Sequence, residues 1–292
     1  QMAFEGDLQV ENLEGRAVVY LLPYFMAEQK VCRKLIELDR TDLKPIRGDM
    51  DELIRLTERQ TGIELSENQK RAVKIAMESG VAVITGGPGT GKTTIINTIM
   101  TIFQYNDFST AIAAPTGRAA KRITETSGYE ASTIHRLLEY CYSEGEDSMR
   151  FGKNEENPLR FDAVIIDEAS MIDIMLMKGL LDAIPAGTRL IIVGDADQLP
   201  PVGAGNVLRD IIESEVISSV KLTEIFRQAK ESFIVVNAHK INKGEYPDIN
   251  ERDKDFFLLH RKSEKEMLAT ILDLCARRLP SYFDDCDPLR DL

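Results

Sequence analysis

The chain has 292 residues, of which 43% are hydrophobic, and this length leaves room for about two domains with sizeable cores. Its formal charge of −12 argues against a wholly basic nucleic-acid coat protein, although net charge does not describe a local groove. No apolar run approaches the roughly 18 residues of a membrane helix, no signal peptide is visible, and the four cysteines lack paired spacing, so we expect a cytoplasmic protein without membrane partner or disulfide.

The first part of the chain, residues 1–64, is predicted to be mostly helical and to form the end of an N-terminal region. "AVVYLL" at 17–22 is typical of a short strand that ends before Pro23. Apolar residues at helical spacing predict helices over 24–40 and 49–62, the second of which closes at a glycine. We find no candidate chemistry in this region.

From residue 65 the pattern changes to strands that alternate with helices. Apolar runs predict strands at 81–85, 110–114, 162–167 and 189–195, and helical spacing predicts helices at 93–105, 117–127 and 171–184. This alternation predicts an α/β fold over 65–220, with a parallel sheet covered by helices on both faces. Ligands of such sheets bind at the carboxyl ends of the strands. A polar stretch at 141–158 interrupts the alternation and contains a candidate hairpin around 144–147, and the methionines Met171, Met175 and Met177 are interpreted as core packing.

The stretch "GGPGTGKTT" at 86–94 follows a predicted strand, opens a predicted helix and matches the phosphate-loop pattern G-x-x-x-x-G-K-[ST]. Glycines let successive backbone N–H groups surround phosphate oxygens, and the helix start adds a positive dipole end. Lys92 is expected to neutralise the β- and γ-phosphates, and the Thr93 hydroxyl to bind Mg²⁺. The predicted nucleotide-binding residues of this loop are Gly87, Pro88, Gly89, Thr90, Gly91, Lys92, Thr93 and Thr94.

Two acids end the strand in "AVIIDEAS" at 163–170. Asp167 suits a second Mg²⁺ contact, and Glu168 suits a base that orients and deprotonates an attacking water. The alternative interpretation is purely structural: the acids end the strand, and Ser170 caps the next helix. Beside a phosphate loop, an acid pair of this kind favours hydrolysis by water over transfer to a metabolite.

Three other segments each have two interpretations. In "LSENQKRAV", Ser66 and Gln69 fit a capping box, and Gln69 also suits the adenine edge. In "AAPTGRAAKRITE", Thr116 and the basic residues from Arg118 onward suit either a phosphate contact or an ordinary solvated helix face. Arg227 in "LTEIFRQAK" is either a surface charge or an arginine finger that reaches the γ-phosphate.

Taken in order, the motifs "LSENQKRAV", "GGPGTGKTT", "AAPTGRAAKRITE", "STIHRLL", "VIIDEASM", "VGDADQLPPVGAGNVL" and "LTEIFRQAKESFIVVNAHKIN" resemble those of superfamily-one DNA helicases. The similarity is greatest to the RecD-like helicases, which are related to the alpha subunit of exonuclease V. It implies a RecA-like ATPase that uses ATP and Mg²⁺ to move 5′-to-3′ on single-stranded DNA in recombination or repair. Its implied partners are single-stranded DNA, duplex junctions and further helicase or repair proteins.

The resemblance also implies roles for individual residues. Gln69 would read adenine, Lys92 and Thr93 would hold phosphates and Mg²⁺, and Asp167 and Glu168 would hold metal and water. Gln198 would sense the γ-phosphate and Arg227 would act as the arginine finger. The residues implied on the DNA side are Thr116, Arg118 and His135.

The same resemblance predicts the arrangement of the remaining chain. The 141–158 interruption falls where the family carries a small pin that splits the duplex, and residues 221–292 would begin a second RecA-like domain that is incomplete. We therefore expect this chain to bind nucleotide, with unwinding dependent on the missing part. The rival hypotheses are a nucleotide-switched DNA-binding module without helicase activity and a phosphate-loop phosphotransferase.

Overall fold

The computed structural model describes residues 7–13, 15–142, 149–224, 232–249 and 255–282. The chain divides into two compact units, residues 1–230 and 231–292, which are considered separately below. Within the described ranges, no helix is both long and apolar enough to cross a membrane.

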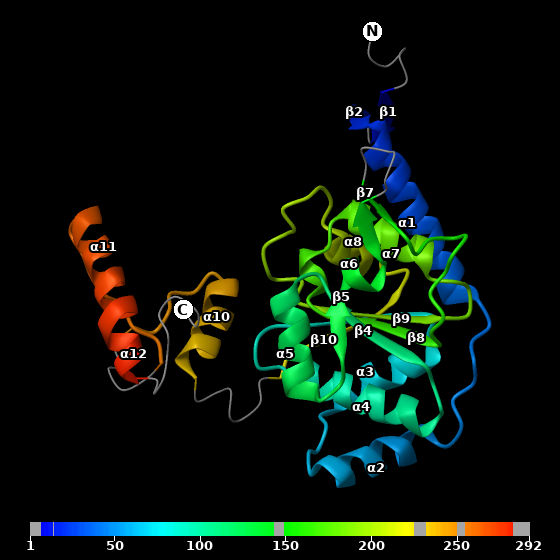
Figure 1. Ribbon diagram of the computed structural model, residues 1–292, viewed down its shortest axis with the longest axis horizontal. Helices are drawn as coiled ribbons and strands as arrows, with labels where there is room; N and C mark the ends of the chain where they lie inside the picture. The colour runs from blue at the N-terminus through cyan, green and yellow to red at the C-terminus, as the bar shows by residue number, and fades with distance from the viewer. Residues whose placement is uncertain (1–6, 14, 143–148, 225–231, 250–254, 283–292) are drawn as a thin grey trace. The chain divides into compact units, whose positions relative to one another are not determined.

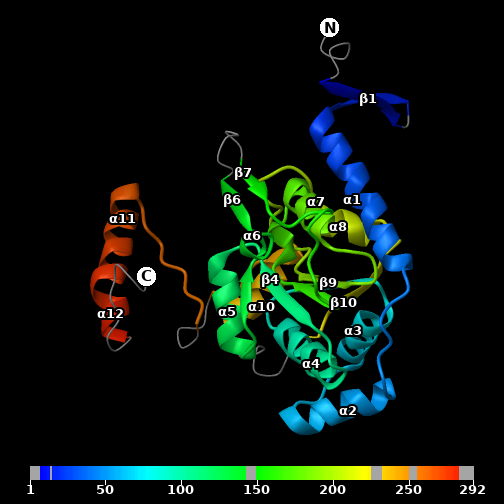
Figure 2. The ribbon, with the colours of Figure 1, turned by 45° about the vertical axis from the view of Figure 1, so that its right-hand side comes forward.

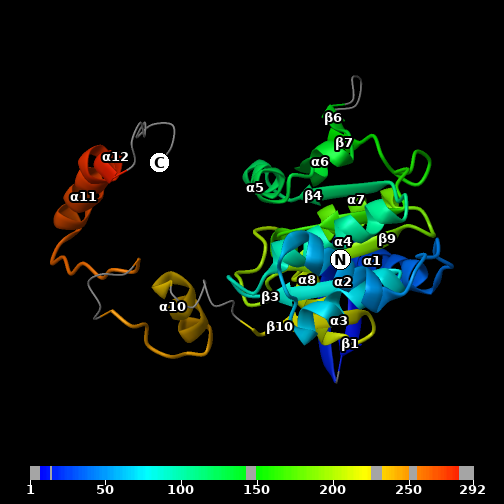
Figure 3. The same ribbon diagram turned by 90° about the horizontal axis from the view of Figure 1, so that it is seen from below.

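The first unit is built on a six-stranded sheet in the order β10-β3-β9-β8-β4-β5, and every neighbouring pair of strands is parallel. Figure 3 shows the succession from β4 through β9 and β3 to β10. The strands are β3 (Val81–Gly86), β4 (Thr110–Ala114), β5 (Ala131–Thr133), β8 (Ala163–Ile166), β9 (Arg189–Gly194) and β10 (Ser218–Leu222). The predicted parallel α/β sheet is confirmed; β5 and β10 form its edges, and β5 was not predicted.

Helices cover both faces of this sheet, as predicted (Figure 1). Successive residues of a strand point to opposite faces, so Val81 and Val83 of β3 join one core cluster whereas Ala82 and Ile84 join the other. One face packs against α1 (Leu22–Arg40), α7 (Ile174–Ala183) and α8 (Val207–Glu213). The other packs against α2 (Met50–Thr61), α3 (Glu67–Glu78), α4 (Lys92–Tyr105) and α5 (Gly117–Ser127).

The N-terminal region contains a hairpin as well as the two predicted helices. β1 (Leu8–Leu13) pairs antiparallel with β2 (Arg16–Leu21), and α1 continues directly from β2 (Figure 2). Pro23 lies in the first turn of α1, where its missing N–H costs no helical hydrogen bond. The strand predicted at 17–22 is therefore confirmed, but it ends because a helix begins, and β1 had no counterpart in the prediction.

The methionine prediction is correct for one residue and wrong for two. Met177 is 1% exposed, but Met171 and Met175 are 49% and 43% exposed. The helix begins only at Ile174, so Met171 lies before it in a 3₁₀ turn. Met175 and Met177 are two residues apart, which places them about 200° apart around a helix, so only one of them can face the sheet.

The polar interruption forms the hairpin that the sequence indicated. β6 (Tyr140–Tyr142) pairs antiparallel with β7 (Met149–Phe151), on the side of the sheet where β4 lies (Figure 3). The turn predicted at 144–147 lies outside the described residues. A short helix, α6 (Ile134–Leu137), precedes the hairpin, and its Ile134 is fully buried in the core beside α7.

In the second unit, the described elements are α10 (Phe233–Asn242), α11 (Glu264–Asp273), a π-helical segment (Leu274–Arg278) and α12 (Leu279–Tyr282). Asp255 accepts hydrogen bonds from the Phe233 N–H at 2.6 Å and the Ser232 hydroxyl at 2.5 Å, so it fixes the start of α10. The assignment of residues 221–292 to a second RecA-like domain remains a prediction, and β10 belongs to the first sheet although it crosses the predicted boundary at 220.

Candidate active site

The predicted site residues follow the carboxyl ends of four adjacent parallel strands. The phosphate loop follows β3, Gln198 follows β9, Asp167 and Glu168 follow β8, and Thr116 follows β4. Since β3, β9, β8 and β4 are neighbours in that order, these segments lie along one edge of the sheet. This edge is where open parallel sheets bind their ligands.

The phosphate loop has the backbone geometry of an anion cradle. Gly89 and Gly91 have positive φ values of 72° and 84°, which turn the chain sharply into α4. No side chain caps the start of this 14-residue helix, so its first N–H groups and dipole are directed at the loop. Thr90 is buried and donates its hydroxyl hydrogen to the Gly87 carbonyl at 2.8 Å, which fixes the loop internally.

Lys92 lies over the loop that it follows. Its Nζ donates to the carbonyl oxygens of Gly86 at 2.5 Å and Gly87 at 3.2 Å. The ammonium group is therefore held at the mouth of the cradle by two neutral acceptors. Among the other predicted residues of the loop, Pro88, Gly89 and Thr93 are exposed, whereas Thr94 is half-buried.

Gln69 joins two elements of the site through both ends of its amide. Its Oε1 accepts from the Ser66 N–H at 2.9 Å, the glutamine half of the predicted capping box. Its Nε2 donates to the Thr90 carbonyl at 3.1 Å and thereby ties the start of α3 to the phosphate loop. The side chain is 2% exposed, and its contact with adenine remains a prediction.

Asp167 and Glu168 sit at the end of β8 in different environments. Asp167 is 9% exposed, and burial, with the Glu168 charge, raises the pKa of its carboxyl, although the Glu168 N–H and the charges of Lys92 and Arg122 oppose this. The Glu168 N–H donates to Asp167 Oδ1 at 2.8 Å. Glu168 is half-buried and has a left-handed φ of 54°, an uncommon conformation for a non-glycine residue and one that clusters at functional sites.

Ser170 does not cap the following helix, contrary to the alternative that the sequence left open. Asp173 is the N-cap of α7, and its Oδ1 accepts from the Leu176 N–H at 2.8 Å. The Ser170 hydroxyl donates instead to Gln198 Oε1 at 3.0 Å. The sequence did not indicate this contact, because the two residues are 28 positions apart and a serine before an apolar helix looks like a local cap.

The residues predicted on the DNA side lie farther along the same edge of the sheet. Thr116 is the N-cap of α5, where its hydroxyl oxygen accepts from the Ala119 N–H at 3.2 Å, and Arg118 in the first turn is exposed. His135 is also exposed and belongs to an aromatic cluster with Tyr140 and Phe151, whose ring centroids lie 5.2 and 6.0 Å from its own. This cluster was not predicted from the sequence, although aromatic residues at both ends of a polar hairpin are a usable signal. Arg227 lies outside the described residues.

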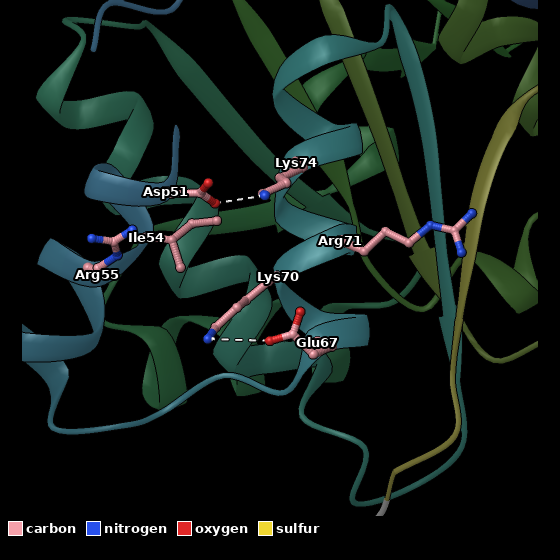
Figure 4. A pocket seen from close by; sticks show the side chains of 7 residues that line it. All are labelled: Asp51, Ile54, Arg55, Glu67, Lys70, Arg71 and Lys74. Atoms are coloured by element: carbon pink, nitrogen blue, oxygen red, sulfur yellow. Dashed lines mark ion pairs between the residues drawn. The ribbon is translucent and has the colours of Figure 1, made fainter. Parts of the chain in front are cut away.

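A separate cavity of about 510 Å³ lies between α2 and α3, and no residue predicted for the nucleotide site lines it (Figure 4). Two of its lysines are paired with acids of the same cavity, Lys74 with Asp51 at 2.7 Å and Lys70 with Glu67 at 3.7 Å. Arg71 points away from this pair of contacts (Figure 4). The lining residues are Asp51, Ile54, Arg55, Glu67, Lys70, Arg71 and Lys74.

The parallel sheet, the glycine-rich loop with its lysine after β3 and the acid pair after β8, two strands away, are the features of a RecA-like P-loop fold. Residues 69–204 match the family model described as an AAA domain. The chain is 36% identical over 234 residues to the ATP-dependent RecD2 DNA helicase of Deinococcus radiodurans, a match that covers 80% of this chain and 31% of the relative. It belongs to the RecD-like family of DNA helicases.

A second relative gives the same result. The RecBCD enzyme subunit RecD of Mycobacterium tuberculosis is 36% identical over 231 residues, which are 71% of this chain and 38% of that subunit. The chain therefore spans about a third of the length of these curated relatives. Among solved structures, the Pif1 helicase from Candida albicans aligns with a TM-score of 0.47 at 22% identity, over 76% of this chain and 56% of that one.

Proposed function

We propose that this chain is the ATP-binding part of a DNA helicase motor, which hydrolyses ATP with Mg²⁺ and uses the energy to translocate along DNA and unwind it. The observation that carries the proposal is the meeting of a phosphate cradle, an acid pair and Gln198 on three adjacent strands. Membership of the RecD-like family supports it. Movement in the 5′-to-3′ direction and a place in recombination or repair rest on the same relationship.

The chemistry of the site fits ATP with Mg²⁺. Backbone N–H groups of the loop and of the start of α4 suit phosphate oxygens, and the Thr93 hydroxyl and the Asp167 carboxylate are oxygen ligands of the kind that Mg²⁺ prefers. A bound Mg²⁺ would neutralise charge on the phosphates. A divalent cation would also favour the ionised form of Asp167, whose pKa burial raises in the free protein.

Lys92 would change its hydrogen-bond partners when nucleotide binds. Its ammonium group would exchange the neutral carbonyls of Gly86 and Gly87 for β- and γ-phosphate oxygens. The phosphate oxygens carry negative charge and the carbonyls do not, so the exchange adds an attraction between opposite charges and favours binding. The loop need not refold, because Thr90 already fixes it through Gly87.

The remaining roles rest on the resemblance of the motifs to those of the RecD-like family. Glu168 would orient and deprotonate the attacking water, Gln198 would donate to the γ-phosphate, and Gln69 would hold the adenine edge through the remaining hydrogen of its amide. Arg227 would supply the arginine finger. The partner nucleic acid would be single-stranded DNA or a duplex junction, gripped from the side of Thr116, Arg118 and His135, with the β6–β7 hairpin as the pin.

The direct test measures ATP turnover by this chain with and without single-stranded DNA. A motor predicts turnover that DNA stimulates, and Glu168→Gln should bind ATP and leave it unhydrolysed, whereas the exposed control Glu52→Gln should behave like the wild type. Nucleotide binding without turnover would favour a nucleotide-switched DNA-binding module. Turnover that is indifferent to DNA would favour a phosphotransferase and contradict the motor.

A further inference from the structure

We propose that Ser170 is a positioning residue that orients the amide of Gln198, so that its Nε2 rather than its Oε1 faces the γ-phosphate. The inference rests on the proposed ATP site and adds a residue to it. Its basis is one contact between two strand ends, the hydrogen bond from the Ser170 hydroxyl to Gln198 Oε1 at 3.0 Å.

The backbone that carries Gln198 is fixed by hydrogen bonds. The Asp195 carboxylate accepts from the Asp197 N–H at 3.0 Å, and the Asp195 carbonyl accepts from the Gln198 N–H at 3.2 Å. Across the sheet, the Thr85 hydroxyl oxygen of β3 accepts from the Ala196 N–H at 3.0 Å. The loop after β9 is therefore held against the strand that leads into the phosphate loop.

The side chain of Gln198 lacks this support, since it is exposed and has three rotatable bonds. A glutamine amide has one accepting end and one donating end, and phosphate oxygens only accept hydrogen bonds. If the amide turned over, its oxygen would face the γ-phosphate and repel it. A sensor of the γ-phosphate at this position therefore needs a neighbour that anchors one end of the amide, so that the other end is held toward the phosphate.

Ser170 can anchor the amide because it is itself held in place, and a phosphate, which only accepts, then favours Nε2 at the free end. It lies in the 3₁₀ turn Ala169–Met171 after β8 and is only 6% exposed. The turn and β9 approach closely, since a Cβ atom added at Gly194 would lie 3.2 Å from the Ser170 nitrogen. Asp173 caps α7, so the Ser170 hydroxyl is free to donate to Gln198 Oε1.

The contact also connects two parts of the proposed mechanism. Glu168, the proposed base, lies two residues before Ser170, and Gln198 is the proposed γ-phosphate contact. One short turn would thus place the water-activating acid and anchor the sensor amide. Loss of the hydroxyl should weaken recognition of the γ-phosphate while it leaves recognition of the rest of the nucleotide unchanged.

The test is the ratio of the dissociation constants of ADP and ATPγS, measured by titration with Mg²⁺ present on the full 292-residue chain. A hydrogen bond of ordinary strength corresponds to a roughly 2- to 12-fold change in affinity. We expect Ser170→Ala to lower the ratio of the ADP to the ATPγS dissociation constant by a factor in that range, mainly because ATPγS binds more weakly. The control Ser214→Ala, whose hydroxyl bonds to the Ile211 carbonyl on α8, should leave the ratio unchanged.

A double-mutant cycle separates positioning from a general structural effect. Gln198→Ala should lower the ratio at least as much as Ser170→Ala, and adding Ser170→Ala to it should change nothing further. A ratio that Ser170→Ala leaves unchanged, or equal losses of ADP and ATPγS affinity, would overturn the proposal. A wild-type chain that binds neither nucleotide would instead refute the proposed function itself.

Discussion

Gly86 offers a sharp test of how the phosphate loop is packed. It is the last residue of β3, and a Cβ atom added there would lie 2.6 Å from Thr90 Oγ1 and 2.9 Å from Leu222 Cβ of β10. The first contact falls on a hydroxyl that already bonds to Gly87, and the second on the adjacent strand. Neither neighbour can give way without moving the loop or the edge of the sheet.

The expected cost of Gly86→Ala follows from this crowding. Overpacking a well-packed site typically costs about 1–3 kcal/mol. For a unit the size of residues 1–230, this corresponds to a fall of roughly 2 to 12 °C in the melting temperature. Displacement of Thr90 would also disturb the Gln69 contact, so ATP affinity should fall together with stability.

Chemical denaturation monitored by circular dichroism measures this cost. Gly117→Ala is the matched control, because a Cβ atom there would meet nothing within 4 Å and alanine favours a helix more than glycine does. Adding Thr90→Ala to Gly86→Ala should cost less than the sum of the two single changes, since it removes the nearest clashing atom. A Gly86→Ala chain as stable as the Gly117→Ala control would refute the packing of β3 against Thr90 and β10.

Two further predictions concern the acid pair and the hairpin. Asp167→Asn should stabilise the nucleotide-free chain at pH 7, because burial raises the pKa of Asp167 in the folded state. Above that pKa the folded chain must hold a buried charge, which lowers its stability. The advantage of asparagine should disappear as the pH falls through this pKa, since the carboxyl then becomes neutral. Denaturation curves at several pH values measure this, and a variant less stable than the wild type at pH 7 would contradict it. Gly179→Ala would place a Cβ atom 2.5 Å from the Phe151 ring, so amide hydrogen exchange in β6 and β7 should accelerate; unchanged protection of the hairpin would show that Phe151 does not anchor it to α7.

The central strands were predictable because they are buried on both faces. Runs such as "VAVIT" and "RLIIVG" are continuously apolar, which is typical of a parallel sheet covered on both sides. β1, in contrast, reads "LQVENL", mixes polar with apolar residues and pairs only with its neighbour. β5 is three residues long and contains no apolar run, so no local signal marks it.

The places of the glycine-rich loop after β3 and of the acid pair after β8 were also predictable, since each is a local motif that follows an apolar strand. The contact of Gln198 with Ser170 and that of Gln69 with Thr90 were not predictable, because each joins residues that the fold brings together, at separations of 28 and 21 positions. The methionines show the opposite case, in which a local signal was misleading. Apolar composition predicted burial for all three, but the start of α7 at Ile174 decides which of them faces the sheet.

The central claim is that this chain holds ATP with Mg²⁺ through its phosphate loop, and equilibrium binding of Mg²⁺-ATP measured by calorimetry tests it most directly. Replacement of Lys92 by alanine removes hydrogen bonds between charged groups, each worth about 1.5–3 kcal/mol, so we predict that the wild type binds and that Lys92→Ala binds at least about tenfold more weakly. Equal affinities for the two proteins, with both folded, would contradict the account.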